Sequence, residues 1–161
     1  MGRIKGWLAI AALASIAVQG RAIAQGEQEL AVRTAAEKLT GGFKWNASTL
    51  LTADFNCTGK VQYAMLGTNI KEIAVAIFTD GLDQPPALLR FEGDALSIVG
   101  SKIRLDDYSM SADDIAGIAG TAPVGYRPSG TCHGVRLSDD RSDAAHIYWD
   151  HENQRFDSWV Q

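Results

Sequence analysis

The chain has 161 residues, 46% of them hydrophobic, and its 15 basic and 19 acidic residues give a formal net charge of −4. This length suits a single domain with one hydrophobic core. Because an acidic chain repels the phosphate backbone at long range, the composition argues against a nucleic-acid partner.

The N-terminus has the organisation of a secretory signal. Arg3 and Lys5 give a basic start, an apolar run of 13 residues occupies 6–18, and small residues occupy 22–24. The run is shorter than the ~20 residues that span a bilayer. We therefore expect a signal peptide that is cleaved after Ala24, and no permanent membrane anchor.

The signal peptide over 1–24 leaves one domain over 25–161. Three basic residues and no acidic residue lie in the signal, so the domain keeps 12 basic and 19 acidic residues and a net charge of −7. We expect this domain to be periplasmic or secreted. Because export places it in an oxidising compartment, its two cysteines, Cys57 and Cys132, are expected to form a disulfide.

The first half of the domain is expected to contain a helix followed by short strands. Apolar residues recur with a period near 3.6 over 26–42, which predicts a helix that ends at two glycines. The following segments are rich in Val, Ile, Tyr and Phe and are separated by turn residues, a pattern typical of antiparallel strands. They are 60–68, 72–80, 86–93 and 101–109.

The strand over 72–80 has apolar residues on both faces. Ile73, Val75 and Ile77 face one way, and two alanines face the other. This pattern indicates a central strand with both faces covered, one of them by a helix.

The second half ends in a hairpin. A short helix is expected over 111–120, with Ser111 as its N-cap, and a loop rich in proline and glycine over 121–131. A strand follows over 132–140, and the hairpin strands are 145–150 and 155–161. The predicted fold class is therefore α+β, with an N-terminal helix and a mostly antiparallel sheet of about six or seven strands that ends in this β-hairpin.

The stretch ADFNCTGKVQYAMLG, residues 53–67, has the spacing of a calcium loop. Asp54, Asn56 and Gly59 match the first, third and sixth positions of the motif D-x-[DN]-x-[DN]-G-x-x-D, while Thr58 and Gln62 replace its other carboxylates. The segment resembles one repeat of the FG-GAP/VCBS type, in which the loop binds Ca²⁺ and a strand follows. The match occurs once, and a propeller needs at least four blades, so the resemblance implies a local loop–strand conformation and not a propeller.

The ligand set of this loop is poor for calcium. Ca²⁺ takes six to eight oxygen ligands, and Asp54 is the one charged residue at the motif positions. We therefore expect a turn in which Asp54 and Asn56 accept backbone N–H groups and Gly59 has a positive φ angle. The alternative is a Ca²⁺ site formed by Asp54, Asn56 and Thr58; no other cofactor is expected.

The C-terminal block carries a second resemblance. Residues 129–160, SGTCHGVRLSDDRSDAAHIYWDHENQRFDSWV, together with 54–67, are similar to a group of small exported proteobacterial proteins. In that group a Cys-containing strand precedes a D-x-x-H-x-Y-W-[ND]-H strand and a terminal Trp hairpin. The group has no assigned activity, so the resemblance implies a compartment and a fold and no mechanism.

The hairpin offers two interpretations. His146 and Tyr148 share one face of their strand, and Trp159 lies on the partner strand. These side chains form either an internal aromatic cluster that stabilises the hairpin or an exposed patch that binds a protein partner.

Catalytic and zinc-binding patterns are weak. Asp143 and His146, with Ser138 or Ser142, contain the residue types of a nucleophilic triad, but no G-x-S-x-G motif is present. The three histidines, His133, His146 and His151, lack the spacing of a zinc site.

Together these patterns favour a monomeric, non-catalytic binding module for a protein partner, such as an inhibitor- or immunity-like domain. The first alternative is a structural domain with a degenerate calcium-loop turn, and the second is a small hydrolase centred on His146.

Overall fold

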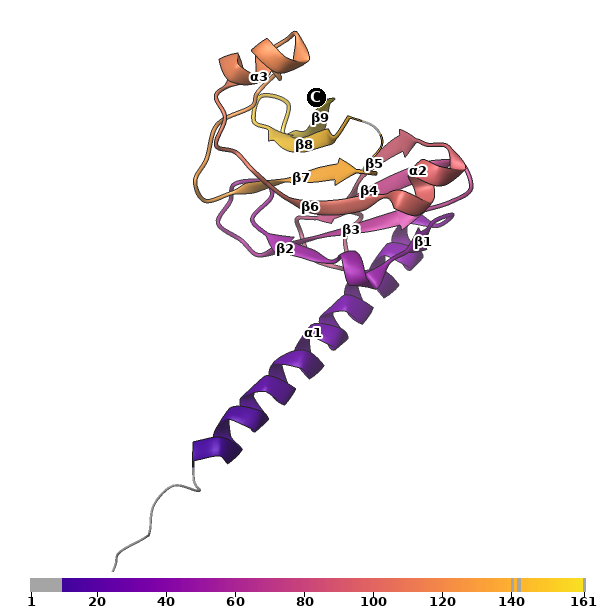
Figure 1. The fold of residues 1–161 in the computed structure, drawn as a ribbon, viewed down its shortest axis with the longest axis vertical. Helices are drawn as coiled ribbons and strands as arrows, with labels where there is room; N and C mark the ends of the chain where they lie inside the picture. Colours follow the sequence, from indigo (N-terminus) through magenta and orange to yellow (C-terminus); the bar gives the residue numbers. More distant parts are fainter. Residues whose placement is uncertain (1–9, 140, 142, 161) are drawn as a thin grey trace, which may run out of the picture.

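The computed structural model describes residues 10–139, 141 and 143–160, and it shows two β-sheets with a long helix packed against one of them (Figure 1). The helices are α1 (Ile10–Thr40), α2 (Ala95–Gly100) and α3 (Ala112–Ala119), with one 3-10 turn, η1 (Ala47–Thr49). The strands are β1 (Lys44–Trp45), β2 (Leu51–Ala53), β3 (Gln62–Thr68), β4 (Glu72–Phe78), β5 (Ala87–Glu92), β6 (Lys102–Asp107), β7 (His133–Ser138), β8 (Ala145–Asp150) and β9 (Arg155–Val160).

The strands form two antiparallel sheets. Sheet A has the order β1-β3-β4-β5, with β2 also paired to β3, and sheet B has the order β6-β7-β8-β9. The predicted α+β class, with its N-terminal helix, antiparallel strands and C-terminal hairpin, is confirmed. The division of the strands into two sheets is the difference from the expected single sheet.

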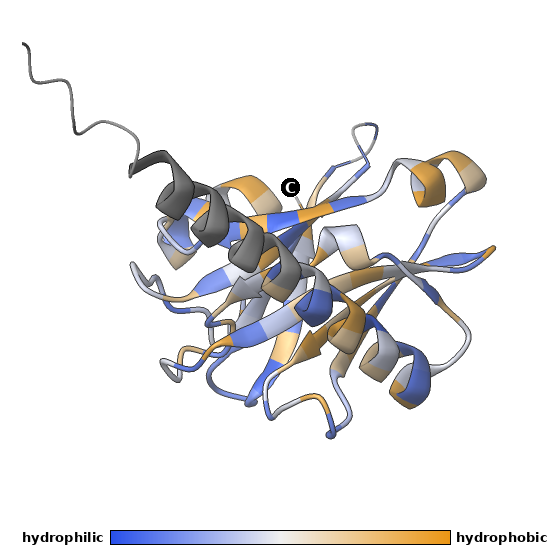
Figure 2. Cartoon of the chain, turned by 90° about the horizontal axis from the view of Figure 1, so that it is seen from below, coloured by the Kyte–Doolittle hydropathy of each residue, from blue (hydrophilic) through white to orange (hydrophobic). Residues whose placement is uncertain are grey.

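The main core lies between the two sheets. Ile73, Val75 and Ile77 on β4 belong to one buried cluster with Val135 on β7 and Ile147 on β8. Figure 2 shows hydrophobic residues concentrated along these central strands. Burial of these apolar side chains between two facing sheets is the main stabilising term of the sandwich.

Helix α1 covers the other face of sheet A. Ala74 and Ala76 on β4 are fully buried there, in a cluster with Val32, Ala36 and Phe78. The prediction that this central strand is covered on both faces, and by a helix on one of them, is confirmed. The small alanine side chains leave room for the helix to pack closely on the sheet.

Helix α1 begins further upstream than predicted. The expected helix covered 26–42, whereas α1 runs from Ile10 to Thr40, and its first turns project away from the sandwich (Figure 1). The expected cleavage point after Ala24 lies inside this helix and stays a prediction. Within the residues that the structure describes, no helix is both long enough and apolar enough to cross a bilayer.

Helix α3 forms as its sequence predicts. The Ser111 hydroxyl accepts a hydrogen bond from the backbone N–H of Asp114, and the Asp114 carboxylate accepts one from the backbone N–H of Ser111. This reciprocal capping box satisfies two N–H groups that have no partner within the helix. The Ser111 side chain also lowers the pKa of the Asp114 carboxyl.

Candidate functional site

The outer face of sheet B brings His146 and Trp159 together. These residues are directly opposite each other on β8 and β9. Their rings are stacked with centroids 4.0 Å apart and an interplanar angle of 6°. The stack fixes the orientation of the imidazole on the sheet.

A carboxylate from a distant part of the chain also holds His146. Asp106 on β6 places Oδ2 2.7 Å from His146 Nδ1. Because an ionised carboxylate can only accept, Nδ1 carries the proton in this contact. The other ring nitrogen, Nε2, is buried and has no hydrogen-bond partner among the described residues.

The partner of His146 differs from the one that the hydrolase hypothesis uses. Asp143 is exposed and has no hydrogen bond to His146. Ser138 lines a different pocket, near Asp143, and Ser142 lies outside the described residues. The expected combination of His146 with Asp143 is therefore replaced by the pair Asp106–His146.

His146 lines a small cavity on this face. The cavity has a volume of about 50 Å³, and Asp106, Met110, Tyr126 and Trp159 are among its other walls. This volume admits a water molecule or a small polar group. None of the described residues that line it is a serine, threonine, cysteine or lysine, so the cavity walls provide no aliphatic hydroxyl, thiol or amine nucleophile.

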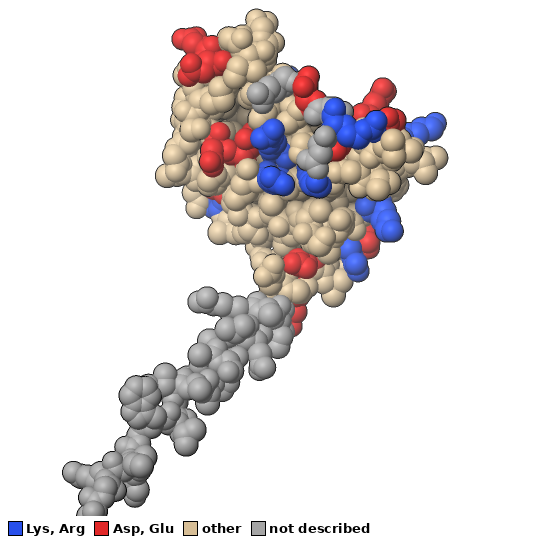
Figure 3. All heavy atoms as spheres, in the orientation of Figure 1, with Lys and Arg blue, Asp and Glu red and all other residues tan. Residues whose placement is uncertain are grey.

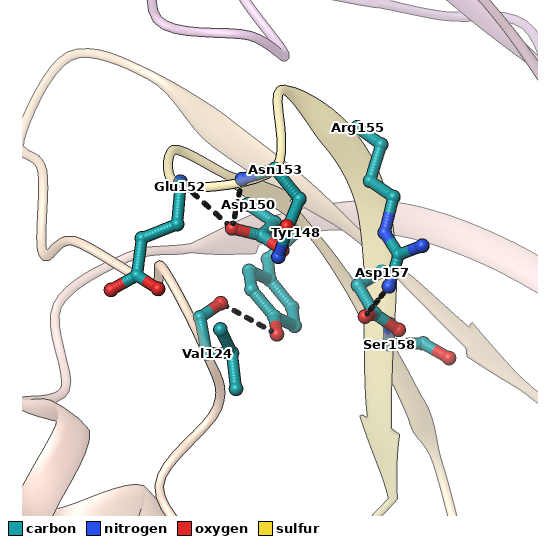
Figure 4. A network of polar contacts seen from close by, with 8 residues as sticks. All are labelled: Val124, Tyr148, Asp150, Glu152, Asn153, Arg155, Asp157 and Ser158. Carbon is teal, nitrogen blue, oxygen red and sulfur yellow. Dashed lines mark hydrogen bonds and ion pairs between the residues drawn. The ribbon is translucent and has the colours of Figure 1, made fainter.

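Tyrosine side chains close the cavity on one side, and their hydroxyl groups are already engaged. Tyr126 donates to the backbone carbonyl of Met110 at 3.1 Å, and Tyr148 donates to that of Val124 at 3.0 Å (Figure 4). Burial raises the pKa of Tyr148 to about 12. These hydroxyls therefore act as structural donors at neutral pH.

The proposed aromatic patch is largely internal. His146 is 8% exposed and Tyr148 3% exposed, while Trp159 is half-buried. The loop over 121–131 covers Tyr148 through the contact with Val124. Of the three side chains, Trp159 therefore offers the largest area to a partner, and partner binding through this cluster stays a prediction.

The β8–β9 turn is organised by Asp150, which is fully buried. Its carboxylate accepts hydrogen bonds from the backbone N–H groups of Glu152 and Asn153 and from the Asn153 side chain (Figure 4). The hydrogen bond from the Asn153 side chain is the largest of the effects that hold the pKa of the Asp150 carboxyl below its usual value. Gly125 packs directly on this carboxylate, and a Cβ atom there would collide with it.

The lowered pKa of Asp150 gives a prediction for acid stability. Near and below the ordinary pKa of 3.8, the folded protein binds fewer protons at this carboxyl than the unfolded chain does. The contribution of the Asp150 carboxylate to the free energy of unfolding is therefore complete above this pKa and is lost as the pH falls below it. Asp150→Asn should therefore be less stable than wild type at neutral pH and should lose less stability on acidification to about pH 2. Urea denaturation across this pH range measures both effects. The exposed Asp143→Asn is the control, and a pH dependence in Asp150→Asn as steep as in wild type would contradict the assignment.

The calcium-like loop is a turn closed by its own hydrogen bonds. Asp54 accepts from the backbone N–H of Thr58 at 3.0 Å and from that of Gly59 at 2.7 Å, and Gly59 has a φ angle of 76°. These parts of the predicted turn are confirmed. The loop is also tied to sheet B by the Cys57–Cys132 disulfide, which is confirmed as well.

The expectation for Asn56 was wrong in one respect. Its Oδ1 accepts from the side chains of Thr58 and Gln62 rather than from backbone N–H groups. The buried Gln62 takes that role, because its Oε1 accepts from the backbone N–H groups of Phe55 and Asn56 at 2.7 and 3.1 Å.

Calcium binding at this loop would require several of these bonds to be replaced. The oxygens of Asp54 and Asn56 already serve as acceptors inside the loop, and the Thr58 hydroxyl donates to Asn56. In the described part of the chain, no three side chains of His, Cys, Asp or Glu are grouped as metal ligands. A Ca²⁺ site formed by Asp54, Asn56 and Thr58 stays a prediction.

The three histidines have separate environments. His133 Nδ1 lies 3.4 Å from Asp107 Oδ1, whereas His146 contacts Asp106, the residue that precedes Asp107 in the sequence. The two aspartates diverge because adjacent strand residues point to opposite faces. His151 lies in the β8–β9 turn.

Sequence reasoning missed a row of residues across sheet B. Arg104 is opposite Arg136, Arg136 is opposite His146, and His146 is opposite Trp159. We call Arg104, Arg136, His146 and Trp159 the cross-strand row. Figure 3 shows basic side chains gathered on this face, where β6 and β7 lie in Figure 1. Strand alternation gives the face of each residue, but the row depends on the pairing register.

Comparison of the chain with protein-family models, curated proteins and solved structures finds no match. The FG-GAP/VCBS-like segment and the similarity to small exported proteobacterial proteins therefore stay predictions.

Proposed function

We propose that the chain is a monomeric, exported, non-catalytic binding module that recognises an acidic segment of a protein partner through the cross-strand row. The observation that carries this proposal is the pair Arg104–Arg136. Both side chains are exposed, directly opposite each other, and without an ion pair or hydrogen bond to the described residues.

This pair is unfavourable in the isolated chain. Like charges directly opposite in an antiparallel pair destabilise the sheet. The chain as a whole has more acidic than basic residues. Even so, no carboxylate among the described residues forms an ion pair with either of these two guanidinium groups. Carboxylates from a partner would remove the repulsion and would accept two parallel hydrogen bonds from each guanidinium.

The rest of the row suits a protein interface. Trp159 is half-buried and held in place by its stack on His146, so little conformational entropy is lost when a partner covers it. Tryptophan and arginine are the residue types that most often dominate binding energy at interfaces. The row lies on the paired strands of a sandwich that also contains a disulfide, and this keeps the surface rigid.

The test uses charge reversal. Arg104→Glu/Arg136→Glu should weaken binding of a fluorescent glutamate-rich peptide at least about tenfold relative to wild type, as measured by anisotropy. The control Lys60→Glu/Lys71→Glu makes the same change in net charge at two exposed positions outside sheet B, in the loop before β3 and in the β3–β4 turn, and should bind as wild type does. Wild-type binding should also weaken as salt approaches about 1 M, where charges are screened beyond ~3 Å.

If the two double variants lost peptide affinity equally, the affinity would depend on net charge alone, and this result would contradict the proposal. Absence of peptide binding by wild type at low salt would contradict it as well.

A second candidate function rests on the Asp106–His146 pair. A histidine that is oriented by a carboxylate, with its second nitrogen free, is the usual arrangement of a general base. The cavity at His146 has room for a water molecule, so a small hydrolase would activate water there. Screening wild type and His146→Gln with ester and phosphoester substrates separates the two functions, because turnover that His146→Gln abolishes would favour the hydrolase.

A further inference from the structure

A second groove shares no lining residue with the cross-strand row. It has a volume of about 490 Å³ and is walled by α1, by β1 with the start of η1, and by α2. Figure 1 shows the C-terminal end of α1, β1 and α2 at the same end of the sandwich. The volume falls in the range of pockets that hold small organic ligands, roughly 300–1,000 Å³. We call it the α1–α2 groove.

Two buried donors without partners belong to residues that line this groove. Trp45 is 4% exposed, and its indole Nε1 is buried with no hydrogen-bond partner among the described residues. Arg33 Nε is also buried without a hydrogen bond; its nearest carboxylate is Glu37, in an ion pair at 3.6 Å. Buried donors are satisfied in the great majority of native structures, so two orphan donors on residues that line one groove require an explanation.

The identity of the two donors restricts the ligand. An indole N–H only donates, and a guanidinium group has no acceptor. The missing partner must therefore supply acceptor atoms. Arg33 and Lys44 line the groove, whereas none of its described lining residues is an aspartate or glutamate, so the local charge favours an anion.

The outer wall of the groove is apolar. Ile98 and Val99 on α2 line it, and Val99 is 86% exposed. A small inorganic anion would leave this wall uncovered, whereas a molecule with an apolar body would bury it and gain hydrophobic free energy. The combination of donors, positive charge and an apolar wall fits an amphipathic anion.

We propose that the α1–α2 groove binds a small amphipathic carboxylate. The carboxylate oxygens accept from Trp45 Nε1 and Arg33 Nε, and the apolar body lies against Ile98 and Val99. This site is separate from the cross-strand row, and the proposal does not depend on the function of that row.

The first test uses octanoate as the probe with the purified chain. Calorimetry should detect binding, and the indole N–H resonance of Trp45 should shift in a ¹H–¹⁵N NMR titration, because the ligand becomes its acceptor. Octylamine, which has the same body and the opposite charge, should not produce this shift. Inorganic phosphate, which has the charge and no apolar body, should bind at least about tenfold more weakly than octanoate.

Two variants locate the site. Trp45→Phe keeps an aromatic ring and removes the N–H, and it should reduce octanoate affinity at least about tenfold; Trp149→Phe, which lies outside the groove, is its control. Val99→Ser changes an exposed residue with no effect expected on folding, so it keeps the test valid if Trp45→Phe fails to fold. Val99→Ser should weaken the binding of octanoate more than the binding of acetate.

Three results would overturn the proposal. The first is no binding of octanoate at millimolar concentration, and the second is equal affinity for octanoate in wild type, Trp45→Phe and Val99→Ser. The third is phosphate binding as tight as octanoate binding, which would indicate a simple anion site.

Discussion

Removal of the disulfide by Cys57→Ala together with Cys132→Ala is expected to lower the free energy of unfolding by about 4 kcal/mol. The bond joins residues 75 positions apart, and a crosslink that closes a loop of this length strongly restricts the unfolded chain. Urea denaturation followed by tryptophan fluorescence measures the change. A loss of this size is a large fraction of the stability of an ordinary domain.

Reduction provides the matched control for this prediction. Wild type in the presence of reductant should unfold at the same urea concentration as the double alanine variant, and the variant itself should be insensitive to reductant. If wild type and variant differed by less than about 1 kcal/mol without reductant, the disulfide would not have the stabilising role that its loop length implies.

Gly134→Ala is expected to lower the free energy of unfolding by about 3 kcal/mol, at the upper end of overpacking effects. A Cβ atom at this position would collide with the backbone carbonyl oxygen of Ile147 and lie 2.7 Å from Tyr108 Cε1. The carbonyl belongs to the neighbouring strand and cannot move without a shift of β8. Displacement of the Tyr108 ring would also break the 2.8 Å hydrogen bond that its hydroxyl accepts from the backbone N–H of Trp149.

Gly130→Ala is the control for Gly134→Ala. A Cβ atom at Gly130 would have no neighbour within 4 Å, so the effect of the substitution should stay within about 1 kcal/mol and should, if anything, stabilise by restricting the unfolded chain. Thermal or urea unfolding of the two variants compares them directly. Similar stabilities for the two would show that sheet B accommodates a methyl group at Gly134.

The parts of the fold that the sequence predicts are those with a local signal. The alternation of Ile73, Val75 and Ile77 with alanines predicts β4 and both of its covered faces, and Ser111 predicts the start of α3. The elements that were missed, β1, β2 and α2, have two, three and six residues. Segments this short contain too few residues to show a period.

The candidate site depends on contacts that no local pattern encodes. Asp106 and His146 are 40 residues apart and lie on strands that are not neighbours in sheet B. The pairing of Arg104 with Arg136 follows from the register of β6 on β7. Sequence alternation assigned the correct face to His146 and Tyr148, but it could not show that the loop over 121–131 covers that face.

The disulfide has a topological consequence for resistance to proteases. It converts the chain from Cys57 to Cys132 into a covalent ring that contains β3 to β6 and α3, while β7 to β9 lie beyond it. A peptide bond cut in the largely exposed turn over 80–84, inside the ring, would leave the two pieces joined through sulfur. After a single cut there, the two pieces would remain one covalent molecule of the same size as the uncut chain. After a cut in the β8–β9 turn, the last strand would be held by sheet pairing and packing alone.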